Sequence, residues 1–244
     1  MKIAVMGGTG LIGSQVVKIL NADGHEAVPH SPSSGVDLIS GAGLPEALKG
    51  ADVVVNLTNS PTFDDASPVF FRESMENLLG AAADAGVGHA VVLSIVGVDE
   101  VPDLVYYRAK VLQEELLAAG PVPYSIVRVT QFFEFMKSVL TWTADEKTVR
   151  LPATRVQPMA SAEVAEAVAE VSTGSPLQGI RSYAGPEVFT LDELGKLALA
   201  AQGDTRTVVT DNTAGMFAAA RGDALIAKAD TIITKLTYRE WLAR

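Results

Sequence analysis

The sequence contains no cysteine among its 244 residues, and this absence excludes several kinds of site. Disulfides, thiolate metal ligands and cysteine nucleophiles are impossible, and nothing indicates an oxidising compartment. The three histidines, His25, His30 and His89, are far apart and lack a nearby carboxylate pattern, so they predict no metal site. A Gly-x-Ser-x-Gly turn and a phosphate-loop lysine are also absent, which leaves hydrolase and kinase chemistry without support.

Positive charge and long apolar runs are scarce as well. Lys and Arg number 19 against 29 Asp and Glu, so the formal net charge is -10. Nucleic acids and anionic membrane surfaces select clustered Lys and Arg, so we expect neither as a partner. No apolar run reaches the roughly 20 residues of a membrane span, and the apolar start at residues 3–6 is too short for a signal peptide. We therefore expect a cytoplasmic protein that acts on a small molecule.

The sequence does have a regular alternation of short β-branched runs with helical patterns. Its hydrophobic content of 48% is enough for one large core. The near-continuous apolar runs at 53–55 and 90–93 are typical of strands covered on both faces. This alternation predicts an α/β protein with a Rossmann-type, doubly wound parallel sheet. We expect strands at 2–6, 26–29, 51–57, 89–96 and 124–129, and helices at 11–22, 44–49, 69–85 and 106–119.

After about residue 141 the rhythm changes to shorter elements separated by prolines. Ser161 is expected to cap the first helix there, and Thr190 with Glu193 forms a capping box for the second. We expect residues 1–150 to form a dinucleotide-binding core and residues 151–244 a smaller α+β region that packs on it as a lid on the substrate side. The helices expected in this region lie at 161–172, 190–201 and 214–220.

A glycine-rich turn, Gly7-Gly8-Thr9-Gly10-Leu11-Ile12-Gly13, stands between the first expected strand and helix. Such a turn lets backbone N–H groups face a phosphate, and the helix start adds a favourable partial charge. We expect Gly7 to allow the tight turn, Gly10 the approach of a pyrophosphate and Gly13 close helix packing. The spacing differs from the dinucleotide-binding pattern Gly-x-Gly-x-x-Gly, so the alternative is a turn kept only for packing. The strand before the turn and the helix after it favour phosphate binding over that alternative. The cofactor ligands expected here are Gly7, Thr9, Gly10, Leu11, Ile12 and Gly13.

This turn, together with Ala-Asp-Val-Val-Val-Asn at 51–56 and Val-Arg-Val-Thr-Gln-Phe at 127–132, resembles the NmrA-like group of atypical short-chain dehydrogenase/reductases. The resemblance covers most of the chain and is strongest over residues 1–135. It implies an NAD(P)-binding Rossmann fold and an oxidoreductase of quinone-reductase type. The group also includes proteins that bind dinucleotide without turning anything over, so the resemblance is more specific for fold than for activity.

The end of the second expected strand bears on the choice between NAD and NADP. In NAD sites an acidic residue about 20 positions beyond the loop bonds the ribose 2′-hydroxyl, and this chain has none there. Relatives that prefer NADP usually place an arginine where this chain has Pro32. His30, Ser31, Ser33 and Ser34 can still bond a phosphate, although a plain Ser/Pro turn explains them equally well. We expect NADP as the cofactor, with NAD as the alternative.

Two further segments are expected to contact the cofactor. Asp37 and Leu38 resemble the family's adenine-side Asp-Leu, whose carboxylate accepts from the adenine amino group, although an aspartate in a surface turn is the alternative. Asn56 and Thr58 follow an apolar strand, at the carboxyl edge where doubly wound sheets bind ligands. Turn-forming residues would look the same at that position.

The chemical centre is expected around Tyr106 and Lys110. These residues are four apart and therefore share one face of a helix, which is the Tyr-x-x-x-Lys spacing of the short-chain reductases. The resemblance implies that Tyr106 donates a proton to the substrate, and that Lys110 binds the nicotinamide ribose and lowers the tyrosine pKa. Ser94 matches the family serine that bonds the substrate oxygen. The spacing also arises by chance in helices, and in NmrA-like relatives the lysine often persists without the tyrosine.

Gln131 and Phe132 follow the strand at 124–129, near where the family binds nicotinamide and substrate. An aromatic face there suits a flat acceptor such as a quinone, although phenylalanines at this spacing are also common in cores. We expect an NAD(P)H-dependent oxidoreductase that transfers hydride to a small carbonyl or quinone-like substrate. The alternatives are a dinucleotide-sensing regulatory protein and, third, a sugar-nucleotide epimerase or dehydratase.

Overall fold

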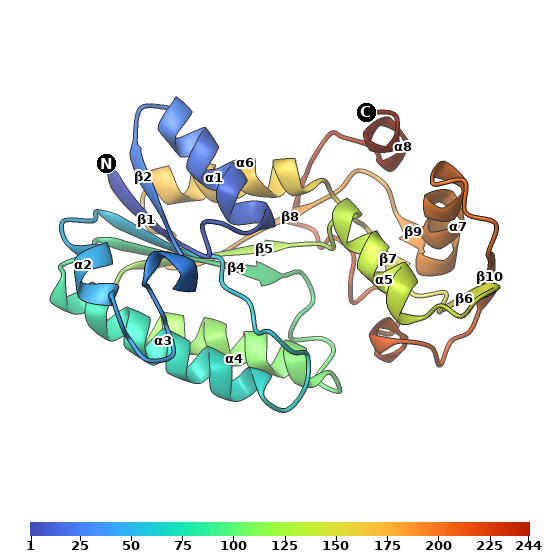
Figure 1. Cartoon of the computed structure of the whole chain (residues 1–244), viewed down its shortest axis with the longest axis horizontal. Coiled ribbons are helices and arrows are strands. Elements are labelled where there is room, and N and C mark those ends of the chain that lie inside the picture. The colour runs from blue at the N-terminus through green and yellow to red at the C-terminus, as the bar shows by residue number, and fades with distance from the viewer. The chain divides into compact units, whose positions relative to one another are not determined.

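The computed structural model describes all residues from Met1 to Arg244 (Figure 1). The chain forms two compact units, each built from three segments. Unit 1 consists of Met1–Ser94, Val105–Arg128 and Val164–Arg181, and unit 2 of Ile95–Leu104, Val129–Glu163 and Ser182–Arg244. Segments from both sides of residue 150 therefore enter each unit.

A mostly parallel seven-stranded sheet runs through the fold in the order β11-β8-β5-β4-β3-β1-β2. Strand β1 lies between β2 and β3, so that Val5 pairs with Pro29 on one side and Val55 on the other. The strand order reverses at this point, as in doubly wound folds, which confirms the predicted fold class. The strands are β1 (Lys2–Met6), β2 (Glu26–His30), β3 (Val53–Asn56), β4 (His89–Ile95), β5 (Tyr124–Val129), β8 (Gly179–Ala184) and β11 (Ile232–Ile233).

Helices cover both faces of the sheet in unit 1. Figure 1 shows α1 and α6 on one face and α3 and α4 on the other. This arrangement explains why β3 and the first part of β4 are apolar on both sides of the strand. The helices are α1 (Leu11–Ala22), α2 (Leu44–Leu48), α3 (Ser67–Asp84), α4 (Val105–Ala119) and α6 (Ser161–Thr173), and a short 3-10 turn, η1 (Pro32–Ser34), follows β2.

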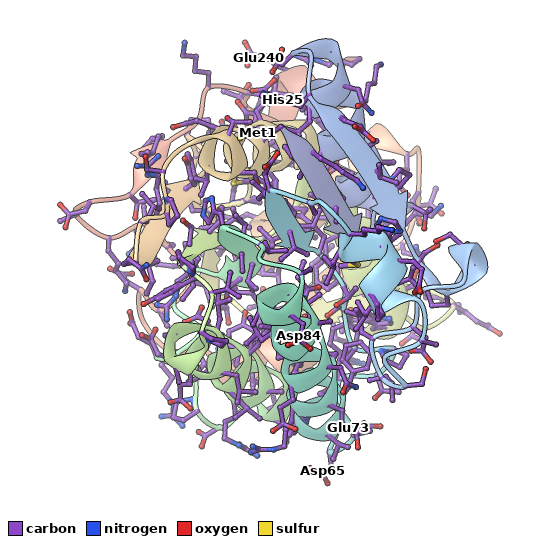
Figure 2. The ribbon with its side chains drawn as sticks, turned by 90° about the vertical axis from the view of Figure 1, so that its left-hand side faces the viewer. Met1, His25, Asp65, Glu73, Asp84 and Glu240 are labelled. Atoms are coloured by element: carbon purple, nitrogen blue, oxygen red, sulfur yellow. The ribbon has the colours of Figure 1, made fainter.

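Helix α3 illustrates how the sequence directs this packing. Phe71, Met75 and Leu78 are spaced by three or four residues, and each is at most 1% exposed. Glu73 and Asp84 lie on the opposite, exposed side, where Figure 2 shows them at the surface. The apolar stripe fixes which side of α3 faces the interior.

Unit 2 contains the shorter elements. Parallel strands β6 (Thr148–Leu151) and β10 (Thr207–Thr210) pair with each other, and β7 (Arg155–Val156) pairs antiparallel with β9 (Phe189–Thr190). Thr190 caps α7 as predicted, and the Glu193 carboxylate accepts the Thr190 N–H at 3.1 Å. The remaining elements are η2 (Phe133–Phe135), α5 (Met136–Trp142), α7 (Leu191–Ala201), η3 (Met216–Ala219) and α8 (Tyr238–Leu242).

The expected strands and helices agree with the structure within two residues at each end, except for the stretch at 214–220. There the alanines form only the 3-10 turn Met216–Ala219. Gly215 adopts φ +67° and Ala220 is extended, so the chain leaves helical geometry on both sides of the turn. No helix combines the length and the apolar character needed to cross a membrane.

One buried histidine in unit 1 makes stability depend on pH. The His89 side chain lies 2.8 Å from Ser125 Oγ, which accepts the Leu177 N–H at 2.9 Å, while His89 Nδ1 is buried without a partner. Burial lowers the pKa of His89 below 6.5, because the charged ring is poorly solvated there. The part of the folding stability that depends on a neutral His89 ring is fully present above pH 6.5, and it is lost as the pH falls below 6.5.

We therefore expect the free energy of unfolding to fall below pH 6.5, by at most about 1.4 kcal/mol per pH unit from this histidine. Urea titrations between pH 8 and pH 5 would measure it. His89→Gln keeps a polar partner for Ser125 without the charge, so its stability should fall less steeply. Equal slopes for the wild type and the variant would show that His89 is not responsible.

Candidate functional site

The glycine turn folds back against the ends of its neighbouring strands. Gly7 has φ +73°, a left-handed conformation that favours glycine. The N–H groups of Gly7 and Gly8 both donate to the His30 carbonyl, at 2.9 and 3.2 Å. A Cβ on Gly13 would lie 2.2 Å from the Gly7 oxygen, so helix α1 can approach the turn only without a side chain there. The turn is tight because several backbone segments meet in it.

The start of α1 is open to an anion. Gly10 at the N-cap supplies no side chain to cap the helix, and the first turn contains no acidic residue. The first N–H groups of a helix need an external acceptor, and the helix end carries a partial positive charge. Thr9, Gly10 and Leu11 are exposed, whereas Ile12 is buried. The arrangement fits a pyrophosphate bound by the backbone.

The segment after β3 lies beside the glycine turn. A Cβ on Gly7 would be 3.0 Å from the Leu57 carbonyl group, so the two loops are in contact. Asn56 is 1% exposed, and its Oδ1 accepts both the N–H of Thr58 at 3.0 Å and its hydroxyl at 2.6 Å. Both loops leave the carboxyl ends of neighbouring strands at the point where the strand order reverses, which is where such sheets bind ligands.

The turn after β2 uses its hydroxyl groups internally. Ser34 Oγ accepts the Ser31 N–H and donates to the Ser31 carbonyl, both at 2.9 Å, and the Ser31 and Ser33 hydroxyls are 2.8 Å apart. His30 Nε2 is buried without a partner. Burial, and then the charge of Lys2, lowers the pKa of His30, so its ring is neutral at pH 7. These residues can offer hydrogen bonds to a ribose 2′ group, but they bring neither a positive charge nor a carboxylate.

Asp37 and Leu38 lie in a firmly held loop. The Asp37 carboxylate accepts the Ile39 N–H and the Ser40 hydroxyl, each at 2.9 Å. These bonds lower the pKa of Asp37, so the group is ionised at neutral pH. Asn77 on α3 donates to the Leu38 carbonyl at 2.9 Å and holds the loop against the helix. An ionised carboxylate on a fixed loop suits an adenine amino group.

Tyr106 lies at the start of α4 within an aromatic cluster. Its ring is 4.8 Å from that of Phe63 and 6.1 Å from that of Phe71. Its hydroxyl donates to Asn59 Oδ1 at 2.6 Å. The expectation that Lys110 lowers the pKa of Tyr106 is wrong for this structure: burial raises that pKa to about 12, and only the hydrogen bond to Asn59 opposes the shift. The phenol is therefore neutral and protonated throughout the physiological range.

Lys110 lies one turn further along α4 and is 4% exposed. Its ammonium group donates to the Leu93 carbonyl at 2.7 Å and to Gln113 Oε1, and it lies 5.0 Å from the centre of the Phe71 ring. Burial lowers the pKa of Lys110 to about 8, while the charge of Glu114 raises it. An ammonium has three N–H bonds, so one remains for a ligand.

Ser94 follows the strand residue that Lys110 contacts. It is 2% exposed, and its Oγ is buried without a hydrogen-bond partner. A buried hydroxyl without a partner is costly, and such groups often mark a site that a ligand completes. The contacts of unit 1 thus bring together Asn59, Tyr106, Lys110 and the end of β4.

Gln131 and Phe132 lie in unit 2, directly after β5. The Gln131 carbonyl accepts the Met159 N–H at 2.9 Å, but both polar atoms of its side chain are buried without partners. Phe132 is half-buried and forms a bridge with Met159. The Gln131 amide retains one acceptor and two donors for a ligand.

Four polar contacts of the site could not be predicted from the sequence. Asn59 holds the Tyr106 hydroxyl, and Gln113 holds the Lys110 ammonium. The Met75 sulfur accepts from Asn56 Nδ2 at 3.3 Å and lies 3.8 Å from Gln113 Nε2. Asn59 directly follows Asn56 and Thr58, which the sequence did single out, whereas Gln113 and Met75 show only helical spacing typical of a core.

Fold and site together define a nucleotide-binding α/β protein with a phosphate turn at the reversal of its strand order. The protein belongs to the NAD(P)H-binding family, whose pattern matches residues 7–173. This match confirms the resemblance to NAD(P)-binding atypical short-chain dehydrogenase/reductases and the predicted NAD(P) cofactor. A Cβ on Gly8 or Gly13 would meet neighbouring backbone atoms at less than 3.0 Å, so the turn keeps its close packing only with glycine at these positions.

A similar protein is the (4-alkanoyl-5-oxo-2,5-dihydrofuran-3-yl)methyl phosphate reductase of Streptomyces griseus subsp. griseus. It is 31% identical over 215 residues, which cover 78% of this chain and 70% of that protein. One relative of this chain is thus a reductase.

Solved structures share the fold. The NADPH-dependent quinone oxidoreductase of Escherichia coli, complexed with NADPH, has 21% identity and a TM-score of 0.68 over 86% of this chain and 78% of that chain. The dTDP-4-dehydrorhamnose reductase of Bacillus anthracis, in complex with NADP, has 15% identity and a TM-score of 0.71 over 97% and 90%. The UDP-glucose 4-epimerase of Thermus thermophilus, complexed with NAD, has 20% identity and a TM-score of 0.70 over 86% of each chain.

Proposed function

We propose that the protein is an NAD(P)H-dependent reductase that transfers hydride to a small conjugated carbonyl or quinone-like acceptor. The observation that carries this proposal is the set of donors in unit 1. Tyr106 and Lys110 share one face of α4, and Lys110 reaches the carbonyl of Leu93 beside the unpartnered hydroxyl of Ser94. A neutral phenol, a hydroxyl and an ammonium group are the donors that a carbonyl reductase needs.

Relatives support the choice of acceptor. The name of the Streptomyces reductase describes an unsaturated lactone that carries a ketone and a phosphate ester. A quinone likewise has a double bond conjugated to a carbonyl. Reduction of such a system adds hydride to the carbon β to the carbonyl, and the resulting enolate takes up one proton. The negative charge develops on oxygen, where neutral donors stabilise it.

In this proposal each residue has a separate task. The bound nicotinamide supplies hydride from C4. Lys110 binds the ribose through its remaining N–H, and the backbone of the glycine turn holds the pyrophosphate. Ser94 donates to the substrate oxygen, and Tyr106 donates the proton after releasing Asn59. Gln131 and Phe132 are proposed to bind substrate.

The direct test is acceptor-dependent oxidation of NADPH and NADH, with fluorescence titrations for binding. The acceptor panel would include naphthoquinones, 2-acylbutenolides with and without a phosphate ester, and simple ketones. We expect turnover with conjugated acceptors and NADPH and NADH affinities within about tenfold of each other, because the β2 turn has neither an arginine nor a carboxylate. No turnover with any acceptor, despite dinucleotide binding, would overturn the reductase.

Replacing Lys110 with methionine should weaken NADPH binding about 10- to 100-fold, because a charge-assisted hydrogen bond is lost from a buried site. In the wild type, affinity should decline as the pH rises through about 8, where Lys110 loses its proton. Lys196→Met, on the exposed side of α7, is the matched control. An alkaline decline that persists in Lys110→Met would assign it to another group.

A dinucleotide sensor is the second candidate, and the engagement of Tyr106 by Asn59 favours it. A sensor needs no proton donor, so the phenol can remain in this hydrogen bond. A redox sensor must bind the reduced and oxidised cofactors with different affinities, since a ligand shifts a conformational equilibrium only through such a difference. Equal affinities for NADPH and NADP⁺, measured by calorimetry, would argue against it.

A further inference from the structure

A buried amide contacts the lysine at the centre of the site. Gln113 is fully buried on α4, three residues after Lys110, and its Oε1 accepts a hydrogen bond from the ammonium group. The same ammonium donates to the Leu93 carbonyl at 2.7 Å. Lys110 is thus held between one strand carbonyl and one side-chain amide, both neutral acceptors.

The other end of this amide leads toward the cofactor loops. Gln113 Nε2 lies 3.8 Å from the Met75 sulfur, which also accepts from Asn56 Nδ2 at 3.3 Å. Asn56 Oδ1 in turn accepts from the N–H and the hydroxyl of Thr58. A continuous series of buried polar contacts therefore connects Lys110 with the end of β3, beside the glycine turn.

The charged groups near Lys110 are already paired. Glu114 forms a two-point hydrogen bond with Arg128, from Nε at 2.9 Å and from Nη2 at 2.6 Å. Its carboxylate acts on Lys110 through its charge. The Phe71 ring lies 5.0 Å away on the α3 side. Among the side chains, Gln113 supplies the hydrogen bond that orients the ammonium group.

We propose that Gln113 is a positioning residue, which holds the Lys110 ammonium at the Leu93 carbonyl and ties it through Met75 to Asn56 at the end of β3. This inference rests on the proposed function, in which Lys110 binds the ribose of a nicotinamide dinucleotide. The amide leaves one N–H of Lys110 free and fixes its direction before the dinucleotide arrives. Gln113 itself does not touch the cofactor.

Two substitutions of Gln113 should shift the pKa of Lys110 in opposite directions. Gln113→Glu places a negative charge beside the ammonium group and should raise the pKa of Lys110 by about one unit or more. Gln113→Met keeps the length of the side chain but removes the acceptor, and should lower this pKa. The titration can be followed without dinucleotide by the 13Cε signal of Lys110, which is assigned as the signal missing from Lys110→Met.

The second readout is the pH dependence of the NADPH dissociation constant. Its alkaline midpoint should move up in Gln113→Glu and down in Gln113→Met, with affinity at pH 8 reduced roughly tenfold in the latter. Gln202→Glu adds the same charge at the exposed C-cap residue of α7 and should leave both readouts unchanged. Circular dichroism would establish that each variant is folded, and either variant alone suffices if the other does not fold.

The proposal would be supported if the two variants shift the pKa of Lys110 in opposite directions and the alkaline midpoint of NADPH binding shifts with it. An unchanged Lys110 titration in both variants, or a shifted titration with an unmoved NADPH midpoint, would overturn it. The lysine titration and the binding curve do not require turnover. Failure of the reductase assay with these shifts intact would therefore count against the proposed function and not against the role of Gln113.

Discussion

Replacing Tyr106 with phenylalanine is expected to lower turnover of a conjugated carbonyl substrate at least about 10²-fold. The dissociation constant for NADPH should stay nearly unchanged. The substitution removes one hydroxyl group and keeps the ring, so the contacts with Phe63 and Phe71 are preserved. Stopped-flow measurement of NADPH oxidation, beside a binding titration, separates the two effects.

The physical reason lies in the protonation state of the phenol. Burial raises the pKa of Tyr106 to about 12, so the group is protonated at every pH at which the protein would be assayed. Its neutral O–H stabilises the developing enolate oxygen in a dry site and transfers its proton to that oxygen as the negative charge builds up. Between pH 6 and pH 9 the activity should therefore show no ionisation of Tyr106.

Tyr107→Phe is the matched control, because this neighbouring tyrosine is 2% exposed on the same helix turn and its ring lies 6.3 Å from that of Tyr106. It should retain most of the turnover. Equal turnover in the wild type and in Tyr106→Phe would remove the proton-donor role, and with continued dinucleotide binding it would favour the sensor. A large loss of binding in Tyr106→Phe would instead show that the phenol supports the cofactor site.

The sequence predicts the sheet well because its signals are local. The apolar run at 53–55, the glycine turn at 7–13 and the helical spacing at 106–119 each lie within one element. Parallel strands with helical crossovers then place the loops after β1 and β3 side by side. The contact between Gly7 and the Leu57 carbonyl group shows these two loops side by side, as expected.

The stretch at 214–220 shows where local signals mislead. Alanine favours a helix, but a helix needs several residues without interruption before its hydrogen bonds offset the cost of its first turn. Gly215 has φ +67°, and Gly222 has φ +55°. These two glycines leave only a few residues between them, and a single 3-10 turn forms.

The polar contacts of the site could not be predicted from spacing. Asn59 and Tyr106 are 47 positions apart, and Gln113 and Met75 are 38 apart. Gln113 on α4 and Met75 on α3 meet because these two helices cover the same face of the sheet (Figure 1). Asn59, in the loop between β3 and α3, meets Tyr106 at the start of α4. Met75 is a core residue by its spacing, and its role as an acceptor follows from the two amides placed beside its sulfur. Such roles depend on tertiary packing and leave no periodic signal.

Gly13→Ala should have the largest effect on both stability and dinucleotide binding. A Cβ at this position would lie 2.2 Å from the Gly7 oxygen and 2.7 Å from the Gly8 Cα, and all of these are backbone contacts that no rotamer change can relieve. Helix α1 would have to move away from the glycine turn. We expect a loss of about 1–3 kcal/mol in the free energy of unfolding and at least a 100-fold loss of NADPH affinity.

Gly80→Ala supplies the matched control for this substitution. Gly80 is exposed on α3 with no atom within 4 Å of a built Cβ, so alanine should stabilise the helix by about 0.5–1 kcal/mol. Urea unfolding and NADPH titration of both variants make the comparison. If Gly13→Ala were destabilised but bound NADPH normally, the glycine turn would serve packing alone. If a folded Gly13→Ala protein bound NADPH weakly while Gly80→Ala bound it normally, the close approach of α1 to the glycine turn would be needed for pyrophosphate binding.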